Sequence, residues 1–159
     1  MTLVVGKLAP VFHLVDTEKQ IITNETIAGQ TTLFLFFPFA FTGTCTKELC
    51  GVRDDLERYN SMQVRVIGVS VDSIYALAKY KTEQELNFTL ASDFNKDMSI
   101  SFDTMYETFA GWMKGVSKRS AFIIDAKGVI QYVEVLENAG EIPDFDAIHE
   151  KLNAMMISK

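Results

Sequence analysis

Residues 31–50, TTLFLFFPFAFTGTCTKELC, indicate the fold because they join a predicted strand to a predicted helix through a proline. The first part of this stretch is continuously apolar, which predicts a buried central strand. Pro38 has no backbone N–H to donate, so the strand should end there. The helix that follows is expected to begin around Cys45, which places this cysteine in the first helical turn.

The rest of the chain alternates apolar strands with amphipathic helices. The expected elements are a continuation of the first helix to residue 60, a strand at 64–72, a helix at 73–86 capped by Ser73, a strand at 87–93, a helix at 96–109, a hairpin at 120–137 and a helix from residue 144. This order predicts an α/β protein with a mixed central sheet and helices on both faces. It is the thioredoxin-like arrangement, in a single domain covering residues 1–159.

The composition narrows the class of partner. The chain has 159 residues, 48% of them hydrophobic, and a net charge of −6. This acidity argues against nucleic acid or an anionic membrane as a partner. No signal peptide or membrane span is expected, so the predicted location is the cytoplasm, where thiols stay reduced. His13 and His149 lie far apart without ligand spacing, so neither a metal site nor a cofactor is expected.

Cys45 is the candidate for chemistry. A thiol reacts as its thiolate, and an ordinary cysteine is only about 3% ionised at pH 7. The free N–H groups and positive dipole end of a first helical turn favour an anion. Lys47 is the one cation nearby in the sequence, and Glu48 opposes it. A further arginine must therefore come from elsewhere in the chain.

Pro38, Thr42 and Cys45 form the pattern P-x-x-x-T-x-x-C, which resembles the signature of the peroxiredoxins. Three other segments resemble that family over nearly the full length of the chain: VGKLAPVFHL at 5–14, KRSAFIIDAKGVI at 118–130 and AGEIPDFDAI at 139–148. The resemblance implies a thioredoxin-like fold. It also implies a thiol-dependent peroxidase that acts on hydrogen peroxide and organic hydroperoxides.

The resemblance implies a role for each matching residue. Cys45 would attack the hydroperoxide and become sulfenic acid. Thr42 would hydrogen-bond the peroxide, and Pro38 would shield the thiolate from water. Arg119 would lie over the sulfur and stabilise negative charge on the departing oxygen. Glu48 would orient this arginine. A thiol reductant such as thioredoxin would complete the cycle, and the resemblance suggests a homodimer.

The position of Cys50 raises a separate question. Five residues along an intact helix separate two Cα atoms by roughly 8–9 Å and turn them by about 140°, too far for a disulfide. A Cys45–Cys50 bridge would therefore require the helix to unwind. The spacing resembles the Q-type branch, the bacterioferritin comigratory proteins, in which the second cysteine resolves the sulfenic acid. The segments FFPFAFTGTC and AGEIPDF resemble the one-cysteine E-type branch, so Cys50 is either a resolving thiol or a buried helix residue.

Other functions on the same fold remain open at this stage. A thiol-disulfide oxidoreductase normally uses C-x-x-C, which this chain lacks. A redox sensor would use oxidation of Cys45 to unwind the helix and change an interface. Phe39, Phe41 and Trp112 either pack in the core and loops or form an aromatic rim around the site.

Overall fold

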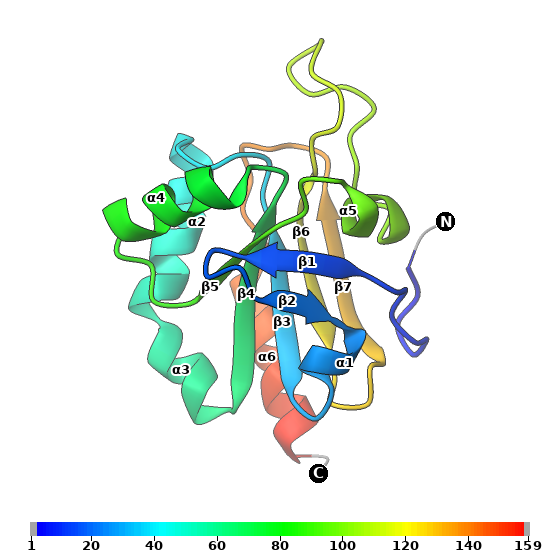
Figure 1. The fold of residues 1–159 in the computed structure, drawn as a ribbon. Coiled ribbons are helices and arrows are strands. Elements are labelled where there is room, and N and C mark those ends of the chain that lie inside the picture. The colour runs from blue at the N-terminus through cyan, green and yellow to red at the C-terminus, as the bar shows by residue number, and fades with distance from the viewer. Residues whose placement is uncertain (1–2, 158–159) are drawn as a thin grey trace.

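The structure, a computed structural model, describes residues 3–157 and is built on one seven-stranded sheet (Figure 1). The strands are β1 (His13–Asp16), β2 (Ile21–Thr23), β3 (Thr31–Phe36), β4 (Val64–Ser70), β5 (Thr89–Ser92), β6 (Arg119–Ile124) and β7 (Ile130–Leu136). The helices are α1 (Asn24–Ile27), α2 (Gly43–Asp54), α3 (Leu56–Ser61), α4 (Ile74–Glu83), α5 (Asp97–Ser101) and α6 (Phe145–Ile157).

The sheet is mixed, as the sequence predicts, with strand order β2-β1-β5-β4-β3-β6-β7. β3, β4 and β5 run parallel, and β6 and β7 continue the sheet antiparallel. Every residue of β3 is buried. This is the burial expected of a continuously apolar strand covered on both faces.

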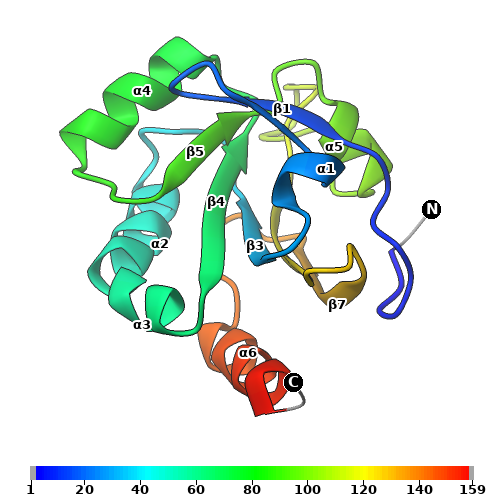
Figure 2. The same ribbon diagram turned by 60° about the horizontal axis from the view of Figure 1, so that its bottom comes forward.

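Helices cover both faces of the sheet (Figure 2). On one face α2, α3, α4 and α6 place apolar side chains against alternate residues of the central strands. On the other face the hairpin of β1 and β2, together with α1 and α5, covers a second apolar cluster. The predicted thioredoxin-like fold is therefore confirmed.

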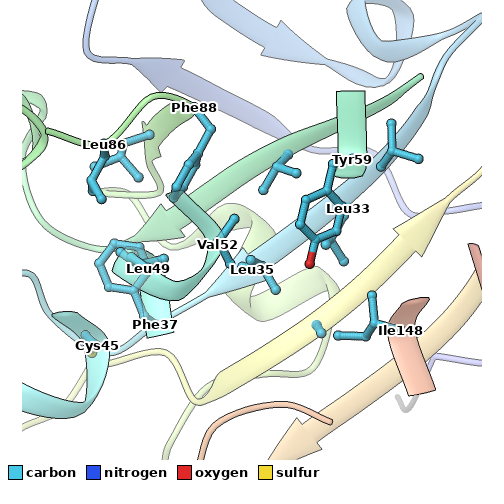
Figure 3. Close-up of a cluster of buried hydrophobic side chains, with 14 of the residues drawn as sticks. Leu33, Leu35, Phe37, Cys45, Leu49, Val52, Tyr59, Leu86, Phe88 and Ile148 are labelled. Atoms are coloured by element: carbon cyan, nitrogen blue, oxygen red, sulfur yellow. The ribbon is translucent and has the colours of Figure 1, made fainter. Parts of the chain in front are cut away.

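The larger core reaches the first turn of α2 (Figure 3). Leu49 and Val52 fix α2 against the sheet, and Cys45 belongs to the same cluster with only 1% of its surface exposed. The apolar face of α2 thus holds Cys45 at the edge of the core, next to Phe37 where the chain leaves β3.

Several sequence expectations match the structure. The helix containing Cys45 begins at Gly43, so this cysteine lies in its first turn. Ser73 caps α4 by accepting a hydrogen bond from the N–H of Ala76 at 3.1 Å. The hairpin of β6 and β7 and the final helix after Pro143 are also present.

The prediction of a helix at residues 96–109 is correct only for α5 and wrong for the residues after Ser101. α5 ends at Ser101, and Asp103 has a positive φ of 50°, which a helix does not accommodate. Residues 104–118 instead form a two-armed loop, closed by paired backbone hydrogen bonds between Phe109 and Met113. This loop projects from the body above the ends of the strands (Figure 1). The spacing of its apolar residues fitted a helix although they belong to a hairpin-like arm.

Two further boundaries differ from expectation. The helix predicted to run to residue 60 breaks at Asp55, which ends α2 and begins α3. The helix beginning after Ser73 stops at Glu83, because Glu85 adopts a left-handed conformation with a φ of 52°. β1, β2 and α1 were not predicted, because their short apolar runs carry little periodicity.

Candidate active site

The sheet register brings Arg119 to the cysteine. β6 runs antiparallel to β3, and Ser120 pairs with Phe36, the last residue of β3. Arg119, one residue earlier, therefore lies at the edge where the chain leaves β3 toward Pro38 and α2. Residues 74 positions apart in the sequence meet here because the two strands are neighbours with opposite directions.

The Arg119 guanidinium contacts Cys45 directly. Its Nη2 donates to Cys45 Sγ at 3.2 Å and to the carbonyl oxygen of Ala139 at 3.0 Å. Ala139 follows β7, so the loop at that edge of the sheet holds the guanidinium in place. Both Arg119 and Cys45 are 1% exposed. A charged donor held next to sulfur in a buried site stabilises negative charge on that sulfur.

A small cavity of about 250 Å³ opens onto the sulfur. Residues matching the peroxiredoxin signature and residues from two loops line it: Pro38, Thr42, Gly43, Thr44, Cys45, Phe109, Arg119, Ala139 and Gly140. The structure therefore brings Pro38, Thr42, Cys45 and Arg119 around one space. The Thr42 hydroxyl donates to the carbonyl oxygen of Phe39 at 3.1 Å. The first backbone hydrogen bond of α2 runs from the N–H of Thr46 to the carbonyl oxygen of Thr42. The N–H groups of the residues before Thr46 therefore have no carbonyl acceptor one turn earlier in the helix.

Glu48 lies one turn after Cys45 and binds the same guanidinium. Arg119 Nη1 donates to Glu48 Oε1 at 2.7 Å, and both side chains are about 1% exposed. Burial raises the pKa of Glu48 to about 7, although the charge of Arg119 pulls it down. Burial lowers the pKa of Arg119, but Glu48 and Cys45 outweigh this effect and leave it above its usual value. Two acidic groups, the Cys45 thiol and the Glu48 carboxyl, thus share hydrogen bonds with the one guanidinium of Arg119.

Asp72 anchors the loop between β3 and α2. Its Oδ2 accepts hydrogen bonds from the backbone N–H of Ala40 at 2.8 Å and from the Ser70 hydroxyl at 2.7 Å. The loop needs this anchor because Phe41 has a left-handed backbone, with a φ of 67°. Such a conformation persists only when surrounding contacts hold it. Asp72 therefore determines where Pro38 and Thr42 lie.

The aromatic residues divide between the site and its surroundings. Phe109, delivered by the 104–118 loop, lines the cavity and contacts the ring of Phe39 at 5.9 Å. Phe41 packs on Tyr80 at 4.9 Å instead, and Trp112 is 74% exposed at the far end of the loop. None of the three aromatics considered as a rim lines the cavity itself, although Phe39 and Trp112 both contact Phe109, which does.

Cys50 does not face Cys45. Both thiols are free, and both belong to the continuous helix α2. The Cys50 Sγ donates to Gln84 Oε1 at 3.6 Å, near the end of α4. Arg53 Nη1 donates to the backbone oxygen of Gln84 at 2.7 Å. These contacts hold the second thiol against α4, on a different side of α2 from the cavity.

Sequence reasoning missed three contributors: Asp72, Ala139 and Phe109. Asp72 carried a usable signal, since it is an acid at the end of the apolar strand predicted at residues 64–72. Carboxyl ends of parallel strands gather at one edge, where sites form. Ala139 acts only through its backbone oxygen, and Phe109 was assigned to the end of the helix predicted at residues 96–109, of which only α5 forms.

Two negative findings concern residues 3–157. No helix in that range has the length and apolar character to cross a bilayer. Within the same range, no three or more histidine, cysteine, aspartate or glutamate side chains gather closely enough to hold a metal ion.

The site holds a buried cysteine in the first turn of a helix, and an arginine from the central sheet of a thioredoxin-like fold contacts its sulfur. These features define a thiol-based redox protein. Residues 5–133 match the AhpC/TSA family. Peroxiredoxin Bcp of Escherichia coli K12 is 34% identical over 129 residues, which is 80% of this chain and 83% of the relative. A putative peroxiredoxin Bcp of Coxiella burnetii is 34% identical over 135 residues, 84% of this chain and 89% of the relative. The chain belongs to the AhpC/TSA family, and the peroxiredoxin resemblance of the sequence is confirmed.

Solved structures agree on the fold. The crystal structure of peroxidoxin BcpB from Mycobacterium tuberculosis superposes with a TM-score of 0.82 at 24% identity, covering 95% of this chain and 97% of that one. A 2-Cys peroxiredoxin of Plasmodium vivax in its reduced state gives a TM-score of 0.83 at 25% identity, covering 96% of this chain and 82% of that one.

Proposed function

We propose that this protein reduces hydroperoxides with the Cys45 thiolate as the attacking nucleophile. The observation that carries the proposal is the 3.2 Å contact from Arg119 Nη2 to Cys45 Sγ beside a cavity of about 250 Å³. Membership of the AhpC/TSA family and relatives named peroxiredoxin support a thiol-dependent peroxidase. Residues 1–159 act in this proposal as one catalytic domain.

The residues around the cavity suit each step. A hydroperoxide enters beside Pro38, and the Thr42 hydroxyl turns from the Phe39 oxygen to the bound peroxide. Sulfur attacks one peroxide oxygen, the O–O bond breaks, and Cys45 becomes sulfenic acid. The guanidinium of Arg119 is already in place to stabilise charge on the departing oxygen. Fixed donors of this kind need no reorganisation during the reaction.

A sulfenic acid trap tests this proposal. The purified protein should consume hydrogen peroxide in the presence of a thiol donor. After one equivalent of peroxide, a dimedone adduct should be found by mass spectrometry on Cys45 of the Cys50→Ser variant. Peroxide consumption without modification at Cys45, or no consumption at all, would reject this cysteine as the nucleophile.

We further propose that Cys50 resolves the sulfenic acid into an intramolecular disulfide. The thiol must leave Gln84, and the intervening turn of α2 must unwind, because the intact helix keeps the two sulfur atoms apart. Wild-type protein treated with one equivalent of peroxide should lose about two mass units relative to the reduced form. The Cys50→Ser variant should instead retain a trappable sulfenic acid. A persistent sulfenic acid in the wild type would assign Cys50 a packing role only.

Gly51 offers a test of the unwinding step. It lies inside α2 next to Cys50, and nothing lies within 4 Å of where its Cβ would stand. Glycine weakens a helix interior by roughly 0.5–1 kcal/mol relative to alanine. Gly51→Ala should therefore slow disulfide formation by up to about fivefold.

The peroxide step provides the internal control for Gly51→Ala. Its rate should not change, because the cavity does not include residue 51. Stopped-flow measurements of the two steps separate them. A variant with raised thermal stability but an unaltered rate of disulfide formation would show that α2 stays helical there.

The electron donor in this proposal is thioredoxin or a similar thiol. An oxidised protein with an unwound α2 would present its disulfide to such a reductant. Free Cys45 and Cys50 suit a reducing compartment, and we place the protein in the cytoplasm. Turnover with a thioredoxin system tests the donor, and cell fractionation tests the compartment.

We also propose that the protein acts as a homodimer. Four exposed aromatic residues follow the carboxyl ends of β3, β4 and β5 or extend above them: Phe41, Tyr75, Phe94 and Trp112. Exposed apolar side chains gathered at one edge are typical of a protein interface. Analytical ultracentrifugation should show a species of twice 17.9 kDa, and a monomer at micromolar concentration would contradict the proposal.

A further inference from the structure

The Cys45–Glu48–Arg119 cluster contains two groups that can become anions but only one cation. One guanidinium hydrogen-bonds both a thiol sulfur and a carboxylate, and all three side chains are about 1% exposed. Cys45 and Glu48 are three residues apart on α2, so their side chains lie on the same face of the helix. Two anions beside one cation leave a net negative charge in a buried site, which is costly.

The second carboxylate oxygen of Glu48 points to the same conclusion. Oε1 accepts from Arg119, but Oε2 is buried and, like Arg119 Nε, has no hydrogen-bond partner among residues 3–157. A buried carboxylate oxygen without a donor is expensive. A neutral carboxyl lowers this cost, since it removes the buried negative charge while Oε1 still accepts from the guanidinium.

We propose, on the basis of the function assigned above, that Cys45 and Glu48 share one proton and that Glu48 supplies it to the peroxide reaction through Arg119 and the cavity. In the reactive state Cys45 is a thiolate and Glu48 is neutral. The shared guanidinium then balances one anion, as two acids at one site often share one proton.

The peroxide reaction balances in atoms, electrons and protons when Cys45 starts as a thiolate and Glu48 starts protonated. The thiolate attacks the hydroxyl-bearing oxygen of a hydroperoxide, the S–O bond forms and the O–O bond breaks with its electron pair going to the departing alkoxide. Sulfur is oxidised by two electrons and the peroxide is reduced by two. The alkoxide ends as an alcohol, the sulfenic acid is neutral, and Glu48 ends as a carboxylate paired with Arg119. The buried site is electrically neutral before and after, and no proton need come from solvent.

The groups around Glu48 support this assignment. They come from every element packed against it: Arg119 of β6, Glu134 of β7, Tyr59 of α3, Tyr80 of α4, His149 of α6, and Cys45 and Lys47 of α2. Arg119 alone hydrogen-bonds the carboxylate among residues 3–157. Burial raises the pKa of both tyrosines well above neutrality, and Glu134 adds to the raised pKa of Glu48. Burial lowers the pKa of His149, which hydrogen-bonds Arg58 and Tyr59 and not Arg119. Glu48, with a pKa of about 7, is therefore the titratable group of this set that hydrogen-bonds the Arg119 guanidinium through a carboxyl.

Proton counting during a single oxidation tests the proposal. The Cys50→Ser background stops the reaction at the sulfenic acid, so only the peroxide step is counted. In weak buffer at about pH 6, below the Glu48 pKa of about 7, one equivalent of hydrogen peroxide should cause almost no proton uptake, measured with an indicator dye. Glu48→Gln in the same background keeps an oxygen for Arg119 but holds no proton. It should take up about one proton per peroxide from solvent.

A pH profile gives a second readout that a merely structural role would not move. In the parent protein Glu48 loses its proton as the pH rises through about 7, so the peroxide rate constant should fall on the alkaline side there. Glu48→Gln holds no such proton, so its profile should lack this alkaline fall. Glu137→Gln is the matched control, since Glu137 is an exposed carboxylate paired with Lys118. It should leave both the proton count and the profile unchanged.

The possible results distinguish failure of the shared-proton proposal from failure of the proposed peroxidase function. An uptake near one proton in the parent protein overturns the inference without any need for the Glu48 variant. Equal counts in the parent and in Glu48→Gln, with normal peroxide reactivity, also overturn it and leave the peroxidase assignment intact. Absence of peroxide reactivity in the parent rejects the function itself.

Discussion

Replacement of Arg119 by methionine is expected to lower the rate constant for peroxide reduction by about 10²- to 10³-fold. The guanidinium does three things at once that a thioether cannot do. It donates to Cys45 Sγ, it donates to Glu48, and it is held by the Ala139 oxygen. Loss of the donor at sulfur reduces the thiolate population, and loss of positive charge removes stabilisation of the departing oxygen. Stopped-flow kinetics under excess peroxide measures the effect.

The same substitution should also destabilise the fold. Removing one partner of a buried ion pair costs about 3–5 kcal/mol when the other stays charged. Glu48 can take up a proton, because burial already raises its pKa to about 7, and this limits the loss. Arg119→Lys keeps the charge but not the fork, so it should fold more stably and react at an intermediate rate.

Lys118→Met is the control for Arg119. It removes a positive charge from the neighbouring residue, but Lys118 pairs with Glu137 at the surface and not with the cluster around Cys45. Its rate constant should stay within about twofold of the wild type, since exposed pairs contribute little. Similar losses in both variants would mean that general charge, rather than the contact at sulfur, governs the rate.

The central part of the fold was accessible to sequence reasoning for a physical reason. β3 is an apolar run that ends before Pro38, and a helix holding Cys45 in its first turn follows. Strand termination by proline and apolar periodicity act locally, so a single sequence displays them. The hairpin of β6 and β7 was visible on the same grounds, with Asp125 and Gly128 at its turn.

The parts that were missed depend on long-range contacts. The apolar residues at helical spacing are Met98, Phe102, Met105 and Phe109. Asp103 and Ala110 nevertheless take positive φ values, and residues 104–118 fold back on themselves. Sequence spacing alone cannot show that Phe109 will pack on Phe39, 70 positions earlier. The break at Asp55 between α2 and α3 has a similar origin, since an aspartate at that position can end one helix and begin the next.

The candidate site shows the same division. The resemblance to peroxiredoxins pointed to Arg119, and the register between β3 and β6 explains why it lies beside Cys45. The pairing of Glu48 with Arg119 was also expected, but its complete burial was not. Cys45 and Glu48 both hydrogen-bond the buried Arg119 because α2 packs closely against the start of β6. Local sequence patterns do not show how closely two such elements pack.

Asp72→Ala is expected to damage catalysis without touching any residue that lines the cavity. The substitution leaves the buried N–H of Ala40 and the hydroxyl of Ser70 without their acceptor. Each unsatisfied group costs about 1–3 kcal/mol, so the loss of both hydrogen bonds should lower the free energy of unfolding by about 2–6 kcal/mol. Urea denaturation measures this loss.

The kinetic effect follows from the strained loop. Phe41, with its φ of 67°, lies between Ala40 and Thr42, and such backbone strain costs about 1–3 kcal/mol. Once Ala40 is released, the loop can relax, and Thr42 then moves away from the cavity. A displacement of about 1 Å in a positioning group can lower a rate by about 10²-fold. The rate constant for peroxide reduction should fall by that order.

Asp72→Asn separates anchoring from charge. The amide oxygen of asparagine can accept from Ala40 N in place of the carboxylate oxygen, so the loop should keep its place and the rate should stay within about tenfold of the wild type. If the charge of Asp72 acted on Cys45 through space, the two variants would change the rate alike. A normal rate in a destabilised Asp72→Ala protein would mean that α2 and the core position Thr42 unaided. The ordering predicted here, with asparagine close to the wild type and alanine far below it, requires that one hydrogen bond from Ala40 fix the entrance to the cavity.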